Sequence, residues 1–142
     1  MPNWCQGKLK VRGTNDAIKH FLTEGIVPVS LGGYKSESII EKDESGLMVK
    51  TNEPIFYIKN THRAFIPQDK IYYKENNEML EVDFQQAWEV STEQLQEISK
   101  LFALDIDVST DEIGVGFSRH VIIKKGTILL DEDISWKKGA NL

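Results

Sequence analysis

Residues 7–13, GKLKVRG, restrict the fold more than any other stretch of the chain. Between two glycines, apolar and basic side chains alternate: Leu9 and Val11 on one side, and Lys8, Lys10 and Arg12 on the other. An alternation with a period of two is typical of a β-strand with one buried and one exposed face. The stretch therefore predicts a half-buried strand whose outer face is cationic.

Two later segments predict helices. In 14–25, TNDAIKHFLTEG, a polar residue can cap the start, an apolar stripe follows at helical spacing, and Gly25 suits the end. In 91–103, STEQLQEISKLFA, a capping box precedes a second apolar stripe. Both helices should therefore bury one face against a sheet.

Two other segments, 79–89 and 104–108, alternate in the same way as the first strand and predict further strands. Phe84 and Trp88 are expected to share the inward face of the first of them. A hairpin that turns near Gly126 is expected to follow, towards the C-terminal end of the chain.

The elements follow one another as strand, helix, strand, strand, helix and strand, which is the split βαβ order (βαββαβ) of the ferredoxin-like fold. In this order KIYYK, residues 70–74, is taken as the partner of the 79–89 strand. We therefore expect an α+β fold with an antiparallel sheet and two helices on one face, in a single domain over residues 1–142. Residues of about 26–70 should form a β-rich insertion against one sheet edge, because short strand-like runs alternate there with turn-like clusters.

In that topology the first strand is central, and acidic residues flank its cationic face on both sides. The expected neighbours are Glu81, Asp83 and Glu89 on one strand, and Asp105 and Asp107 on the other. Opposite charges on neighbouring strands stabilise by roughly 0.2–1 kcal/mol per pair. A nucleic-acid platform is the alternative, but the outward central positions hold no aromatic residues on which bases could stack. Paired charges are therefore the preferred interpretation.

The charge balance and the cysteine content bear on the partner and the compartment. The chain has 142 residues, a net charge of −5 and a pI near 5.2. Diffuse nucleic-acid binders are usually basic, so the acidity favours a protein partner. No apolar run approaches the ~20 residues of a membrane span, and the N-terminus lacks a secretory layout. A single cysteine makes no internal disulfide, so a reducing cytoplasm is expected.

Two motifs resemble those of a known family. The chain starts Met-Pro-Asn-Trp-Cys at residues 1–5, and a Phe-x-x-Ala-Trp strand that ends at Trp88 precedes the second helix. This pattern resembles the YubB-type ferredoxin-like proteins, which are small proteins of unknown function carried by bacteriophages, prophages and plasmids. The resemblance covers roughly residues 1–25 and 79–126, whereas 26–78 departs from it.

The resemblance implies a mobile-element protein in the cytoplasm of a bacterial host, and it brings no catalytic residues. It also supports structural roles for Trp4 and Cys5, and the same role is expected for Phe84 and Trp88. Cysteine is commonly a small buried apolar residue. No base lies near Cys5 in the sequence to activate its thiol.

The residues that could carry chemistry form no recognised constellation. His20, His62 and His120 have no metal-binding companion three or four residues away, and one cysteine builds no zinc site. The segment 105–116 alternates acids as a calcium loop does, but Thr110 stands where that loop needs glycine. We therefore expect no catalytic residues, no metal and no cofactor.

Three charged clusters are candidate binding sites. One is basic and loop-like, with Lys59, His62 and Arg63. Two are acidic and turn-like, with Glu41, Asp43 and Glu44 in one, and Asp131, Glu132 and Asp133 in the other. Solvated loops and turns are the simpler interpretation of all three. The acidic clusters could alternatively mimic phosphates toward a basic partner.

These observations lead to three functional hypotheses. The first is a non-catalytic binding protein, encoded by a phage or other mobile element, whose partner is a macromolecule of the host or the phage. In one version it is anti-CRISPR-like and inhibits a host defence nuclease, with acidic groups engaging a groove built for phosphates. The alternative is a nucleic-acid-binding accessory protein, and a small enzyme is the least favoured. An exposed edge strand could pair with a partner or with a second copy, so the oligomeric state is open.

Overall fold

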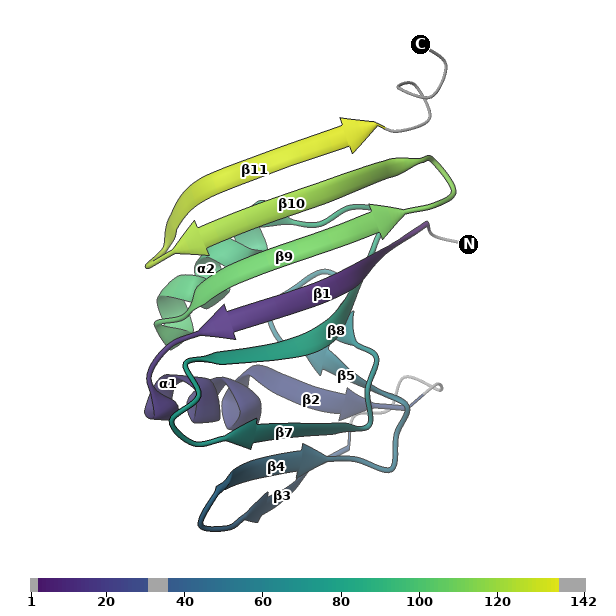
Figure 1. Cartoon of the computed structure of the whole chain (residues 1–142). Coiled ribbons are helices and arrows are strands. Elements are labelled where there is room, and N and C mark those ends of the chain that lie inside the picture. The colour runs from purple at the N-terminus through teal and green to yellow at the C-terminus, as the bar shows by residue number, and fades with distance from the viewer. Residues whose placement is uncertain (1–2, 31–35, 136–142) are drawn as a thin grey trace.

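The computed structural model describes residues 3–30 and 36–135, which form two antiparallel sheets and two short helices (Figure 1). The larger sheet has eight strands in the order β11-β10-β9-β1-β8-β6-β5-β2. In that order the strands span Thr127–Ser135, Phe117–Lys124, Asp105–Glu112, Trp4–Arg12, Met79–Ala87, Ala64–Ile66, Ile55–Ile58 and Ile26–Val29. The smaller sheet has the order β3-β4-β7, with strands spanning Ile39–Lys42, Gly46–Lys50 and Lys70–Lys74.

Both predicted helices form with the expected N-terminal caps, but the capping box at 91–94 is only half formed, because the Ser91 amide donates to the Gln86 side chain and not to Gln94. Helix α1 (Asn15–His20) continues into the π-helical turn η1 (Phe21–Gly25), and α2 (Thr92–Phe102) lies between β8 and β9 in sequence. The hydroxyl of Thr14 accepts a hydrogen bond from the Ala17 amide at 3.1 Å, and the Ser91 hydroxyl accepts one from the Gln94 amide at 3.4 Å. Within the described residues, no helix combines the length and the apolar character that crossing a bilayer requires.

The ferredoxin-like α+β prediction is wrong. Strands make up 53% of the described residues and helices only 17%. The strands β6, β5 and β2, expected in a separate insertion, continue the main sheet beyond β8, and β10 and β11 extend its opposite edge. The result is an eight-stranded antiparallel sheet in place of the compact two-helix layer that was expected.

The partner predicted for KIYYK is also wrong. This run is β7, and it pairs with β4 in the smaller sheet, with Tyr72 opposite Met48. The neighbour of β8 is instead the short strand β6, with Ala64 opposite Gln86. Strand β7 therefore precedes β8 in sequence without lying beside it in a sheet.

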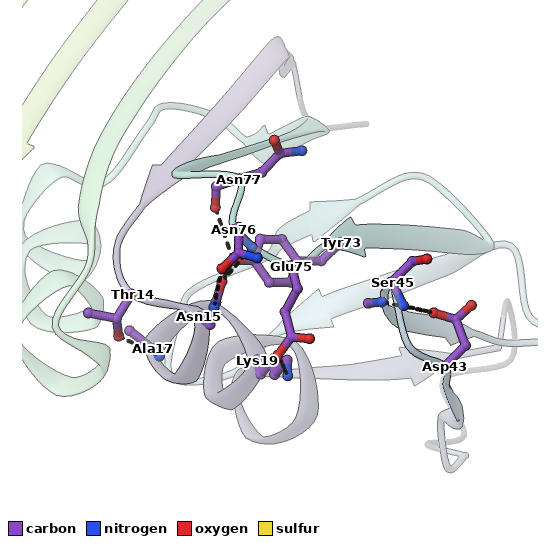
Figure 2. A network of polar contacts seen from close by, with 11 residues as sticks. Thr14, Asn15, Ala17, Lys19, Asp43, Ser45, Tyr73, Glu75, Asn76 and Asn77 are labelled. Atoms are coloured by element: carbon purple, nitrogen blue, oxygen red, sulfur yellow. Dashed lines mark hydrogen bonds and ion pairs between the residues drawn. The ribbon is translucent and has the colours of Figure 1, made fainter.

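A polar network holds the turn between β7 and β8 against α1 (Figure 2). The Asn15 side-chain oxygen accepts hydrogen bonds from the hydroxyl of Tyr73 and, at 2.9 Å, from the amide of Asn76. Lys19 forms an ion pair with Glu75 one turn further along α1. Because Tyr73 is almost fully buried, burial raises the pKa of its hydroxyl. The network anchors the smaller sheet to the main core.

The central placement of β1 is confirmed. It pairs antiparallel with β8 and with β9, and Leu9 stands opposite Val82 and Val108. These apolar residues are buried, as are the inward residues of α2, and α1 and α2 contact each other. The outward residues of β1 consequently lie on the other face of the sheet, where Lys8 and Lys10 stand opposite acids.

Candidate functional site

The exposed face of the main sheet carries the predicted pairs of opposite charges. Lys8 forms an ion pair with Asp83, and the hydrogen bond between them raises the pKa of Lys8. The Lys10 ammonium lies 3.9 Å from a carboxylate oxygen of Glu81. Glu89 lies beyond the end of β8 and does not flank the stripe. The basic stripe is therefore partly neutralised by its neighbour.

The acids on the other side of β1 are engaged elsewhere. An Asp107 carboxylate oxygen lies 2.8 Å from Nε2 of His120, and an Asp105 oxygen accepts a hydrogen bond from the Lys125 amide at 2.9 Å. His120 lies within β10, opposite Ser109 of β9. Strands β9 and β10 therefore carry a histidine–carboxylate pair on the exposed face.

Two hollows lie on this face, over β1, β9, β10 and β11. One has a volume of about 410 Å³ and includes Arg12, Asp107, Ile122 and Leu129 in its lining. The other, about 210 Å³, includes Ser118, His120, Glu132 and Ile134. Both basic and acidic residues line the first hollow, and His120 of the second hollow already pairs with Asp107. Both hollows therefore offer a surface of mixed charge for contact with a partner.

The acidic run at 131–133 lies in a strand, so the expectation of a turn is wrong. Asp131, Glu132 and Asp133 are consecutive residues of β11, the outermost strand of the main sheet. Exposed apolar side chains flank them, with Leu129 60% exposed and Ile134 55% exposed. This strand therefore combines acidic and apolar groups at a sheet edge.

An arginine that the sequence reasoning did not single out anchors β11. The Nε of Arg119 lies 2.8 Å from an Asp131 oxygen and 3.2 Å from an Asp133 oxygen. Its Nη2 donates to the Thr92 hydroxyl at 2.9 Å, and that hydroxyl donates to Asp131 at 2.9 Å. The network connects β10 and β11 to the start of α2. The sequence carried a signal for this residue: Arg119 is basic, whereas the residues that share its side of β10 are apolar.

Asp131 is ionised more readily than an ordinary aspartate. Burial acts to raise its pKa, but hydrogen bonds from Arg119 and Thr92 outweigh this and lower the pKa. Two carboxylates, Asp131 and Asp133, share the one guanidinium, and Glu132 forms no ion pair with any residue that the structure describes. Strand β11 therefore keeps a net negative charge.

The basic candidate cluster lies in the turn between β5 and β6, and different contacts hold each member. The Lys59 amide donates to the Gly25 carbonyl at 2.9 Å, and the His62 amide donates to the Gln94 side chain at 2.8 Å. The Arg63 guanidinium lies 5.5 Å from the centre of the Trp4 ring.

An aromatic row beside Arg63 was missed by the sequence analysis. The ring centres of Trp4 and Phe65 are 6.0 Å apart, and those of Phe65 and Tyr57 are 5.8 Å apart. These residues come from β1, β6 and β5, and all three are half-buried. Only the pairing of β6 with β5 and β8 places Phe65 between the other two rings.

The other acidic cluster is explained by local structure. Glu41 forms an ion pair with Lys50 across β3 and β4 at 2.7 Å. Asp43 accepts hydrogen bonds from the amides of Ser45 and Gly46, at 2.7 and 2.8 Å, which shape the turn that also holds Glu44. This turn and β11 lie at opposite ends of the molecule (Figure 1). The two acidic clusters therefore do not form one surface.

The four residues with expected structural roles divide into two groups. Cys5 and Phe84 are buried, and Trp4 is half-buried. Trp88 lies beyond the end of β8 with a positive φ of 71°, and it is 54% exposed. Its expected inward position is therefore wrong, although its carbonyl accepts a hydrogen bond from the Cys5 thiol at 3.5 Å.

Cys5 is expected to resist alkylation while the protein is folded. Burial, with a smaller contribution from Glu112, raises the pKa of its thiol to about 11. At pH 8 only about one thiol in a thousand would be ionised, and the thiolate is the reactive form. Mass spectrometry after iodoacetamide treatment should find Cys5 unmodified in buffer and modified in urea. Rapid modification in buffer would contradict the buried placement.

Comparison with known proteins assigns no family. No family model, no curated protein and no solved structure matches the chain. In the described part of the chain, no group of three or more histidine, cysteine, aspartate or glutamate residues is placed to hold a metal ion. Function is therefore inferred from the chemistry of the surfaces described above.

Proposed function

We propose that the chain is a non-catalytic binding protein that contacts a basic protein through β11. The observation that carries this proposal is the exposed strand itself, in which three consecutive acids lie between exposed apolar residues at a sheet edge. Acidic groups steer a basic partner toward the encounter, and apolar side chains supply contact area once the two are close. Both kinds of group are present on β11.

A host defence nuclease is the partner class that we favour. The resemblance of residues 1–5 to the start of the YubB-type proteins supports an origin in a phage or other mobile element, acting in a bacterial host. Nucleases such as CRISPR effectors have basic grooves that bind phosphates, and an acidic strand is complementary in charge to such a groove. The net charge of −5 adds to that attraction.

A cleavage assay tests this partner class. Purified CRISPR effector nucleases, each loaded with its guide, are incubated with an excess of the chain and then with target DNA at low salt. We expect slower cleavage by at least one of them, with the inhibition weakening as salt is raised. Unchanged cleavage throughout the panel would reject the nuclease as the partner.

A nucleic-acid-binding function is the second candidate, and the aromatic row favours it. Trp4, Phe65 and Tyr57 provide ring faces, and Arg63 provides a positive charge beside them. Stacking on aromatic side chains and salt-sensitive phosphate contacts are the usual basis of single-strand binding. A labelled single-stranded oligonucleotide should then bind at low salt and lose affinity in Arg63→Ala. An unshifted oligonucleotide at low salt would remove this candidate.

A further inference from the structure

We infer that β11 accepts an extended cationic segment of the partner as an added strand of the main sheet. This inference rests on the proposed function and specifies how the partner binds. In β-strand addition, main-chain hydrogen bonds supply affinity and alternate side chains supply specificity. The evidence comes from the edge geometry, the charge and the flanking side chains of β11.

The edge geometry separates β11 from the other end of the main sheet. β11 is nine residues long, lacks proline and has β10 as its one strand neighbour within the described residues. The backbone groups of every second residue therefore face away from β10, as at any sheet edge. The opposite edge strand, β2, has four residues and includes Pro28, whose carbonyl already accepts a hydrogen bond from the Ser36 amide. Strand β11 is the better template.

The charge of β11 selects a cationic strand over a second copy of this chain. If two copies of β11 paired antiparallel about their centre, Asp131 would stand directly opposite its own copy, with the other acids of both runs next to it. Like charges directly opposite in a sheet are destabilising. A partner with lysine or arginine at these positions would instead meet Glu132, which is unpaired among the described residues, and two carboxylates that share Arg119.

The side chains that flank the acids define the rest of the pattern. Leu129 precedes the acidic run and Ile134 follows it, and both are exposed. The complementary segment therefore has two or three basic residues between apolar ones. Arg119 and Thr92 hold β11 in position before binding, so little ordering of this edge is needed when a segment adds to it.

A synthetic peptide provides the probe. Acetyl-Thr-Val-Lys-Arg-Lys-Thr-Val-Thr-amide has the required pattern, and a peptide with three glutamates in place of the cations is its control. Hydrogen–deuterium exchange of the full chain is measured with each peptide. We expect the cationic peptide to slow exchange over 127–135, while the acidic peptide has no effect. Unchanged exchange in 127–135 with the cationic peptide overturns the inference, as does equal protection by the acidic one.

Two charge-reversal variants localise the binding. Glu132→Lys should weaken binding of the cationic peptide at least about fivefold, because it places a cation opposite a cation. Glu44→Lys makes the same charge change in the turn between β3 and β4, and it should leave the affinity within about twofold of the wild type. The reverse pattern would place the binding surface at the smaller sheet and overturn the inference.

The same variants separate this inference from the proposed function. A nuclease that is inhibited equally by the wild type and by Glu132→Lys would leave nuclease binding standing, but it would overturn β11 as the contact surface and strand addition with it. If the chain forms a dimer that protects residues 127–135 from exchange, the strand added to β11 is a second copy of the chain. That result would overturn the inference that β11 binds a cationic segment of the partner. Inhibition that is lost in Glu132→Lys and retained in Glu44→Lys supports both proposals.

Discussion

The Gly7→Ala variant is expected to lose roughly 3 kcal/mol or more of its free energy of unfolding. A Cβ at this position would lie 1.8 Å from the carbonyl oxygen of Ser109 and 2.8 Å from Cα of Thr110. Both atoms belong to the backbone of β9, so no side-chain rotation relieves the overlap and the two strands would have to separate. Urea unfolding followed by tryptophan fluorescence measures the loss.

Gln6→Ala is the matched control for this variant. It changes the preceding residue of the same strand, whose side chain is exposed, and it leaves the close approach of β1 and β9 intact. Its free energy of unfolding should stay within about 1 kcal/mol of the wild type. Wild-type stability in Gly7→Ala would show that the pairing of β1 with β9 is not as described.

We expect the Arg119→Met variant to lose about 2 kcal/mol of its free energy of unfolding at pH 7. This loss is smaller than the loss from breaking a fully buried ion pair, because Asp131 and Asp133 are partly exposed. The Arg119 side chain is 13% exposed, and removal of its guanidinium leaves Asp131 and Asp133 side by side without a cation. Methionine keeps the apolar length of the side chain, so the loss reports the charge and the hydrogen bonds. Exchange over β11 should also become faster, because the contacts of Arg119 with Asp131, Asp133 and Thr92 are lost and only the hydrogen bond from Thr92 to Asp131 still connects this strand to α2.

The loss in Arg119→Met should depend on pH. The pKa of Asp131 is lowered in the folded protein, because the hydrogen bonds from Arg119 and Thr92 outweigh the effect of burial. The stabilisation is therefore complete above the ordinary aspartate pKa of 3.8 and disappears as the pH falls through the lowered value. The difference between wild type and variant should therefore be constant above about pH 5 and shrink as the pH falls below 3.8 and on through the lowered pKa. A difference that grows on acidification would contradict the network.

Arg12→Met is the control for the arginine. Arg12 is exposed and makes no ion pair within the part of the chain that the structure describes. Its replacement should change stability by less than about 0.5 kcal/mol at either pH. Equal losses in the two variants would indicate an effect of net charge in place of the local contacts of Arg119.

The parts of the fold that follow from local pattern could be predicted from the sequence. The alternation in 7–13 identified β1, and the acids at 81 and 83 identified the strand that flanks it. The caps at Thr14 and Ser91 located both helices. In each of these cases the signal lies within one element or in the charges of two neighbouring strands.

The strand order beyond β8 could not be predicted in the same way. AFI and IFYI are apolar runs of three or four residues, and nothing within them specifies a partner. KIYYK precedes the strand 79–89 and suggested a hairpin with it. The segment KIYYK pairs with β4 instead, because Tyr73 is buried in that arrangement and its hydroxyl donates a hydrogen bond to Asn15 on α1. This contact joins residues far apart in the sequence, so no local pattern could indicate it.

The candidate site was located only in part. The residues Asp131, Glu132 and Asp133 were singled out by composition, but three consecutive acids do not alternate and therefore suggested a turn. The strand forms because all three acids pair in register with residues of β10, and β10 also supplies Arg119 for two of them. Trp88 was misplaced because alternation was extended past Ala87, where β8 ends.

A charge swap between β11 and the peptide tests the binding claim most directly. The central arginine of the cationic peptide is replaced by glutamate, and both peptides are titrated against the wild type and against Glu132→Lys by calorimetry. Either single change should weaken binding several-fold, and the two changes together should restore most of the affinity, because a cation again faces an anion. If the changed peptide binds Glu132→Lys with an affinity that is reduced by the full product of the two single reductions, Glu132 does not face the partner and β11 is not the docking edge.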